Sequence, residues 1–68
     1  MSDLFPDALP DLDAQIKEVQ REIGQRERVY PRFVSNGTLK QATADRQMTV
    51  MRAVLNTLST IRNDRGRA

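Results

Sequence analysis

The stretch YPRFVSNGTL, residues 30–39, separates two long segments that each carry a helical pattern of apolar residues. Pro31 removes one helical hydrogen bond and crowds the carbonyl four residues earlier, so we expect the first helix to end or kink there. Asn36 and Gly37 form a stop signal, because either residue can adopt the left-handed conformation that closes a helix. The stretch therefore predicts an elbow at residues 35–39 between two antiparallel helices.

The segment before the elbow has a narrow apolar stripe. Its apolar residues are spaced four, three and four apart, which is a helical period: Leu12, Ile16, Val19 and Ile23. Asp11 and Asp13 stand at its start, where they complement the positive end of the helix dipole. We therefore predict a helix over residues 10–34, with a break near Pro31.

The segment after the elbow has a wider apolar pattern. Thr38 and Gln41 match the T-x-x-Q capping box and predict where the second helix starts. An inner stripe repeats the helical spacing: Ala44, Met48, Met51, Leu55 and Leu58. A flanking stripe lies beside it: Val50, Val54 and Ile61. We predict a helix over residues 40–63 whose apolar side is wider than one partner helix can cover.

A chain of 68 residues has few ways to stabilise a two-helix hairpin. It contains neither Cys nor His, which excludes disulfides and Cys/His zinc sites and leaves oligomerisation as the usual solution. We therefore expect an all-α fold, an antiparallel two-helix hairpin paired into a dimeric four-helix bundle. We expect residues 1–9 to form a flexible acidic and apolar arm, and residues 64–68 to form a basic tail.

The same composition excludes several kinds of catalyst. Without His, neither a Ser-His-Asp nor a Cys-His arrangement is possible. The glycines occur singly, so no phosphate-cradling loop is present, and the carboxylates do not converge on a metal. No signal peptide is visible, and no apolar run approaches the roughly 20 residues of a membrane span. We expect a cytoplasmic protein that is not an enzyme and has no catalytic residue, cofactor, metal or membrane contact.

Charge is distributed unevenly along the chain. Residues 1–20 contain one basic and five acidic side chains, a net charge of −4, whereas residues 21–40 and 41–68 each contain five basic and two acidic ones, a net charge of +3. Arg dominates the basic residues, and its planar guanidinium suits bidentate binding of carboxylates or phosphates. The basic segments are therefore candidates for binding a partner.

The most informative basic segment leads into the elbow and holds two of the three aromatic residues. Arg and Tyr are frequent hot-spot residues of interfaces. The candidate partner-binding residues are Arg26, Arg28, Tyr30, Arg32 and Phe33. A purely structural interpretation is also open, in which Tyr30 and Phe33 close the end of the hairpin while the Arg side chains point to water. The two interpretations are compatible.

The elbow also carries a family resemblance. Residues 30–39 fit Y-P-R-x-V-x-x-G-x-L, and residues 44–58 fit A-x6-M-x-A-x3-T-L. The combination resembles a group of short phage and prophage proteins, over about residues 18–61. A looser similarity is to a small phage anti-quorum-sensing protein, from which no functional residue is carried over. The resemblance implies a phage origin and action on a component of the bacterial host.

Three functions are compatible with these features. The first is a non-enzymatic protein of a phage or prophage that forms a homodimer in the bacterial cytoplasm and binds a host protein, which it modulates or inhibits. The second is a nucleic-acid-binding accessory protein that uses the Arg-rich elbow and the C-terminal tail, although a net charge of +2 is low for tracking phosphates. The third is a structural or assembly component of a virion.

Overall fold

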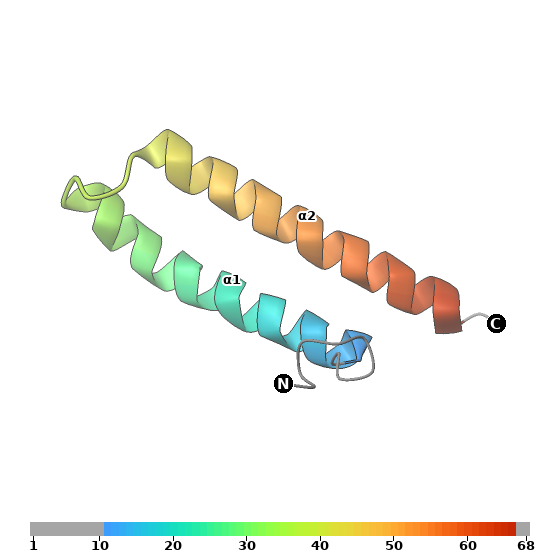
Figure 1. The fold of residues 1–68 in the computed structure, drawn as a ribbon. Coiled ribbons are helices and arrows are strands. Elements are labelled where there is room, and N and C mark those ends of the chain that lie inside the picture. Colours follow the sequence, from blue (N-terminus) through green and yellow to red (C-terminus); the bar gives the residue numbers. More distant parts are fainter. Residues whose placement is uncertain (1–10, 67–68) are drawn as a thin grey trace, which may run out of the picture.

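The computed structural model describes residues 11–66, which form two long antiparallel helices joined by a short loop (Figure 1). Helix α1 spans Leu12–Ser35 and helix α2 spans Gln41–Gly66. The expected all-α hairpin is therefore confirmed. The arm expected at residues 1–9 lies outside the described residues. Neither of the described helices is long and apolar enough to cross a membrane.

Helix α1 starts where an acidic side chain caps it. Oδ1 of Asp11 accepts a hydrogen bond of 2.8 Å from the backbone N–H of Ala14, which satisfies one of the free donors of the first turn. Asp13 adds a second negative charge to this turn and complements the helix dipole. The helix therefore begins at Leu12, two residues later than expected.

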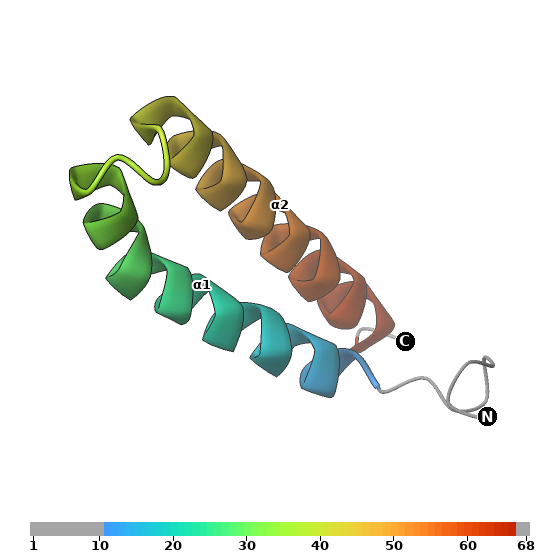
Figure 2. The same ribbon diagram turned by 60° about the vertical axis from the view of Figure 1, so that its left-hand side comes forward.

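Helix α1 continues through Pro31, so the predicted break near this residue is wrong. The backbone angle φ of proline is already close to the helical value, and the cost is one missing hydrogen bond to the carbonyl of Glu27. Glu27 and Pro31 are both exposed, so this carbonyl lies on a side of the helix where water can bind it. Helix α1 is bowed over its length, whereas α2 is nearly straight (Figure 2).

The loop closes around Gly37, whose φ of 81° lies in the left-handed region that favours glycine. The N–H of Gly37 donates to the carbonyl of Val34 at 3.2 Å, and the N–H of Leu39 donates to the carbonyl of Phe33 at 3.1 Å. These bonds satisfy carbonyls of the last turn of α1 and reverse the chain direction. The stop signal that the sequence places at Asn36 and Gly37 is thus supplied by the glycine.

The predicted cap of α2 at Thr38 is wrong. The backbone N–H of Thr38 donates at 2.9 Å to Oδ1 of Asn36, so Thr38 belongs to the loop turn that the asparagine side chain organises. Helix α2 starts later, at Gln41, and its first backbone bond joins the N–H of Ala44 to the carbonyl of Lys40 at 3.0 Å. Lys40 therefore occupies the cap position.

Helix α2 extends to Gly66, beyond the predicted end at residue 63. The first part of the expected basic tail at residues 64–68 is thus helical, and residues 67–68 lie outside the described residues. Arg65 places a positive charge in the last turn, where it complements the negative end of the dipole. Arg62 joins this end to α1, because its Nη1 lies 3.3 Å from Oδ1 of Asp13.

The core between the helices is thin. Among the described residues, the buried apolar side chains are Ile16, Ile23, Ala44 and Met48. The other expected core residues are half-buried: Leu12, Val19, Met51, Leu55 and Leu58. A two-helix hairpin has only one internal interface, so the residues beside the central line stay in contact with water.

Candidate interaction surfaces

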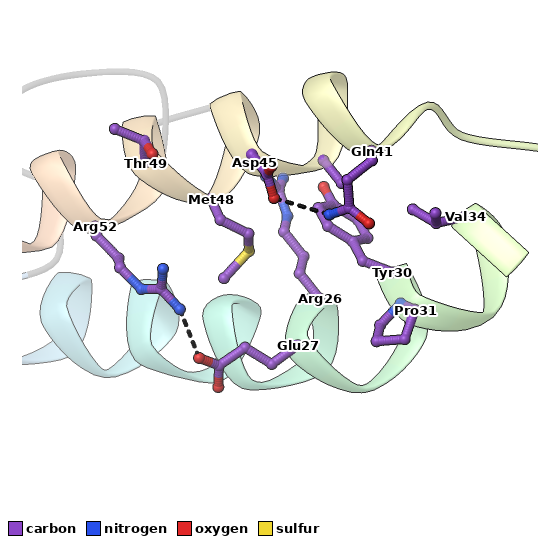
Figure 3. Close-up of a pocket in the computed structure, with 11 residues that line it drawn as sticks. Arg26, Glu27, Tyr30, Pro31, Val34, Gln41, Asp45, Met48, Thr49 and Arg52 are labelled. Atoms are coloured by element: carbon purple, nitrogen blue, oxygen red, sulfur yellow. Dashed lines mark hydrogen bonds and ion pairs between the residues drawn. The ribbon is translucent and has the colours of Figure 1, made fainter.

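One side of the hairpin is polar and is crossed by two ion pairs. Nη2 of Arg52 lies 2.8 Å from Oε2 of Glu27, and Arg62 pairs with Asp13 nearer the open end of the hairpin (Figure 3 shows the first pair). All four side chains are about half exposed to solvent, so each pair stabilises the hairpin by less than about 1 kcal/mol. The charges of these four side chains are therefore neutralised within the hairpin.

The carboxylates that line the groove between the helices on this side already have partners. Met48 points across this groove towards α1 (Figure 3). Asp45 accepts a hydrogen bond of 2.9 Å from the amide of Gln41, and Glu27 pairs with Arg52. Within residues 11–66, no cluster of acidic side chains is able to hold a metal ion.

Two of the five candidate partner-binding residues, Arg26 and Tyr30, are engaged inside the hairpin. The Tyr30 hydroxyl donates a hydrogen bond of 2.7 Å to Oε1 of Gln47 on α2. The guanidinium carbon of Arg26 lies 6.0 Å from the centre of the Tyr30 ring, and Nε of Arg26 lies 3.1 Å from Oε2 of Glu22. Both side chains are half-buried. Tyr30 thus joins α1 to α2, whereas the printed contacts of Arg26 lie within α1, against Glu22 and the Tyr30 ring.

The other three candidates lie together on the outer side of α1. Arg28, Arg32 and Phe33 line a shallow hollow of 740 Å³, whose lining also includes Val29, Glu22, Gln25 and the two engaged candidates Arg26 and Tyr30. Phe33 is 37% exposed, although it is a large apolar residue. The guanidinium groups of Arg28 and Arg32 make no hydrogen bond or ion pair with any residue between 11 and 66. We call Arg28 and Arg32 the loop-end arginines.

A second surface is apolar and lies on the side of the hairpin opposite to the ion pairs. We call it the apolar face and define it by Val19 on α1 and by Val50, Val54, Leu58 and Ile61 on α2. On α2, Val50, Val54 and Ile61 are 48%, 39% and 37% exposed. Because a helix turns by about 100° per residue, Val54 points away from the side on which Arg52 lies.

The apolar face is continuous across both helices. Val50 is shared by two adjoining hollows on α2, and Val54 and Leu58 line a third one together with Val19 of α1. Exposed apolar groups that gather in this way on a small protein mark a surface for association. The flanking stripe of Val50, Val54 and Ile61 thus belongs to a larger apolar surface, to which α1 contributes Val19.

One exposed ion pair on α1, between Glu18 and Arg21, shifts the pKa of both side chains. Nε of Arg21 lies 3.3 Å from Oε1 of Glu18, and a second nitrogen of the same guanidinium binds the other carboxylate oxygen. The hydrogen bonds from Arg21 lower the pKa of the Glu18 carboxyl below its usual value. The same contact raises the pKa of Arg21. The pair lies at the surface within one helix, so it does not form a site.

Sequence reasoning missed the residues that join the two helices across the hairpin. Gln47 was not a candidate, and neither were the pairs Glu27–Arg52 and Asp13–Arg62. Their partners are far apart in the chain, but in each case they lie at nearly equal distances from the loop. Pairing residues at equal distances from the loop, as an antiparallel hairpin requires, would have predicted these contacts.

No family model, curated protein or solved structure matches the chain. The two surfaces described above therefore carry the argument about function.

Proposed function

We propose that this chain is a non-enzymatic interaction protein that binds a bacterial host protein through the loop-end arginines and Phe33, and thereby modulates or inhibits it. The observation that carries the proposal is the pair of guanidinium groups without a partner among residues 11–66, beside an exposed aromatic ring. Arg and aromatic side chains are the residues that most often dominate the energy of binding. The phage or prophage origin is part of the proposal and rests on the resemblance of the elbow motif.

The chemistry of the hollow indicates what the partner offers. Two arginines four residues apart lie about one helical turn apart, so both guanidinium groups can reach one surface. A guanidinium binds a carboxylate through two parallel hydrogen bonds. The apolar floor of Val29 and Phe33 accepts an apolar side chain. The partner that fits is a protein surface in which carboxylates surround an apolar residue.

The proposal includes a homodimer in the cytoplasm of the bacterial host. The apolar face gives the physical reason, because a single hairpin leaves Val50, Val54 and Ile61 in water. Pairing two hairpins through this face makes a four-helix bundle with one common core. The loop-end arginines stay outside that core, because they lie on the outer side of α1.

The test compares the full chain with three variants as baits in a host lysate, with and without nuclease. Arg28→Ala and Arg32→Ala remove one guanidinium each, and Arg46→Ala is the matched control, since Arg46 is an exposed arginine outside this hollow. We expect one captured protein that survives nuclease, is retained by the control variant and is lost with at least one loop-end variant. Its affinity should fall by about 30-fold or more for that variant, which is the effect of a hot spot of about 2 kcal/mol.

Two outcomes would contradict this function. If capture is lost on nuclease treatment, and both loop-end variants weaken binding to nucleic acid equally while lowering the salt dependence by about one unit each, the arginines bind phosphates. If the captured protein is bound equally by all three variants, the loop-end arginines are not the binding surface.

A further inference from the structure

We infer that the apolar face is covered by a second copy of the chain in the reverse direction, with α2 against α2, α1 against α1 and Val54 on the two-fold axis. The inference rests on the homodimer proposed above and specifies its geometry. In this arrangement the two loops lie at opposite ends of the bundle. The alternative two-fold arrangement has both loops at the same end and stacks α1 on α2.

The α2 side of the apolar face is symmetric about Val54. Val50 and Leu58 each lie four residues from Val54, and Gln47 and Ile61 each lie seven residues from it. In an antiparallel pair of identical helices centred on Val54, each Val50 meets a Leu58 of the other copy and each Gln47 meets an Ile61. A two-fold interface requires this self-complementarity, because one patch must fit a copy of itself.

Gln47, the polar residue of this symmetric stripe, already accepts a hydrogen bond within the hairpin. Oε1 of Gln47 accepts the hydrogen bond from Tyr30, so covering this end of the stripe does not strand that oxygen. Ala53, next to Val54, is exposed and has a small side chain. A second helix can therefore come close to α2 at the point where the two copies cross.

The geometry has a consequence for binding. With the loops at opposite ends, the two pairs of loop-end arginines lie at the two ends of the bundle and cannot contact the same partner patch. One dimer therefore binds two partner molecules at separate sites.

The natural absence of cysteine allows a direct test by disulfide formation. The variant Val54→Cys places a thiol on the proposed axis, so two copies meet there. Helices in contact have axes about 8–10 Å apart, which brings facing Cα atoms within the 4.4–6.8 Å that a disulfide needs. The matched control is Asn56→Cys, an exposed position two residues away that points to the opposite side of α2. A mixture of Val19→Cys and Leu58→Cys tests the alternative arrangement, in which these two residues meet.

We expect Val54→Cys to form a covalent dimer under mild oxidation, while Asn56→Cys and the Val19/Leu58 mixture do not. Light scattering of the same variants under reducing conditions measures the dimer independently of the disulfide. A Val54→Cys protein that is dimeric when reduced but gives no covalent dimer overturns the geometry and leaves the homodimer standing. A wild-type protein with the mass of a monomer overturns both.

Discussion

The Tyr30 hydroxyl donates a hydrogen bond of 2.7 Å to Oε1 of Gln47, and this bond fastens α1 to α2 near the loop. The same ring lies under the guanidinium of Arg26, whose Nε is in turn held by Glu22. Tyr30 is therefore the centre of a small polar network at the end of the hairpin where the core is thin. Tyr30, a candidate partner-binding residue from the sequence, thus also stabilises the fold, and its part in binding stays a prediction.

Replacing Tyr30 by Phe tests this role. The ring stays and the hydroxyl is lost, so the free energy of unfolding should fall by about 1 kcal/mol, the usual net value of a hydrogen bond. Urea denaturation followed by circular dichroism measures the change at a fixed protein concentration, which matters for a chain that associates. Gln47→Ala should have a similar cost, and the double variant should cost no more than the larger single change. Additive losses would show that the two side chains do not interact in solution.

Pro31→Ala should stabilise the hairpin. Alanine restores the N–H that α1 lacks and removes the clash of the ring with the preceding turn, and a proline inside a helix costs about 3 kcal/mol. The gain is smaller than that, roughly 1–2 kcal/mol, because alanine also gives the unfolded chain more freedom. The thermal midpoint measured by circular dichroism should rise. A lower midpoint would mean that the bowed shape of α1 is needed for packing against α2.

Two neighbouring substitutions on α2 separate folding from association. Leu55 is half-buried on the side of Ala44 and Met48, so Leu55→Asp places a charge in the core and should unfold the chain, at a cost of several kcal/mol. Val54 lies in the apolar face, so Val54→Asp should keep most of the helical signal but reduce the mass to that of a monomer. Circular dichroism and light scattering on the same samples measure both. A Val54→Asp protein that stays dimeric would exclude the apolar face as the interface.

The lowered pKa of Glu18 should depend on its contact with Arg21. The hydrogen bonds from Arg21 lower this pKa in the folded chain, so the pair stabilises the fold above the unfolded pKa of the carboxyl, and the contribution is lost as the pH falls through the folded pKa. Arg21→Gln should return the pKa to its ordinary value, as measured by NMR titration of the side-chain carbons. An unchanged low pKa in the variant would place its cause elsewhere, for example in Lys17, which is a close neighbour in the sequence.

The sequence by itself determined the two helices, their order and the loop that joins them. The apolar stripes at helical spacing and the stop at Asn36 and Gly37 are local signals, because they depend on residues close together in the sequence and determine the backbone conformation there. It also indicated the arginines near the elbow and the stripe of Val50, Val54 and Ile61 as candidate surfaces for a partner; this stripe is exposed in the structure, and its partner stays a prediction.

Only the tertiary structure decided how these features combine. Pro31 is a break by local rules, but the helix continues because the proline lies on its exposed side and the flanking turns pack against α2. Thr38 is a cap by local rules, but the side chain of Asn36 holds its backbone in the loop. Tyr30 is bound to Gln47 of α2, whereas the guanidinium groups of Arg28 and Arg32 have no partner among the described residues, because the register of α1 against α2 determines which residues of α1 meet α2. That register depends on contacts between residues far apart in the chain, and no local pattern contains it.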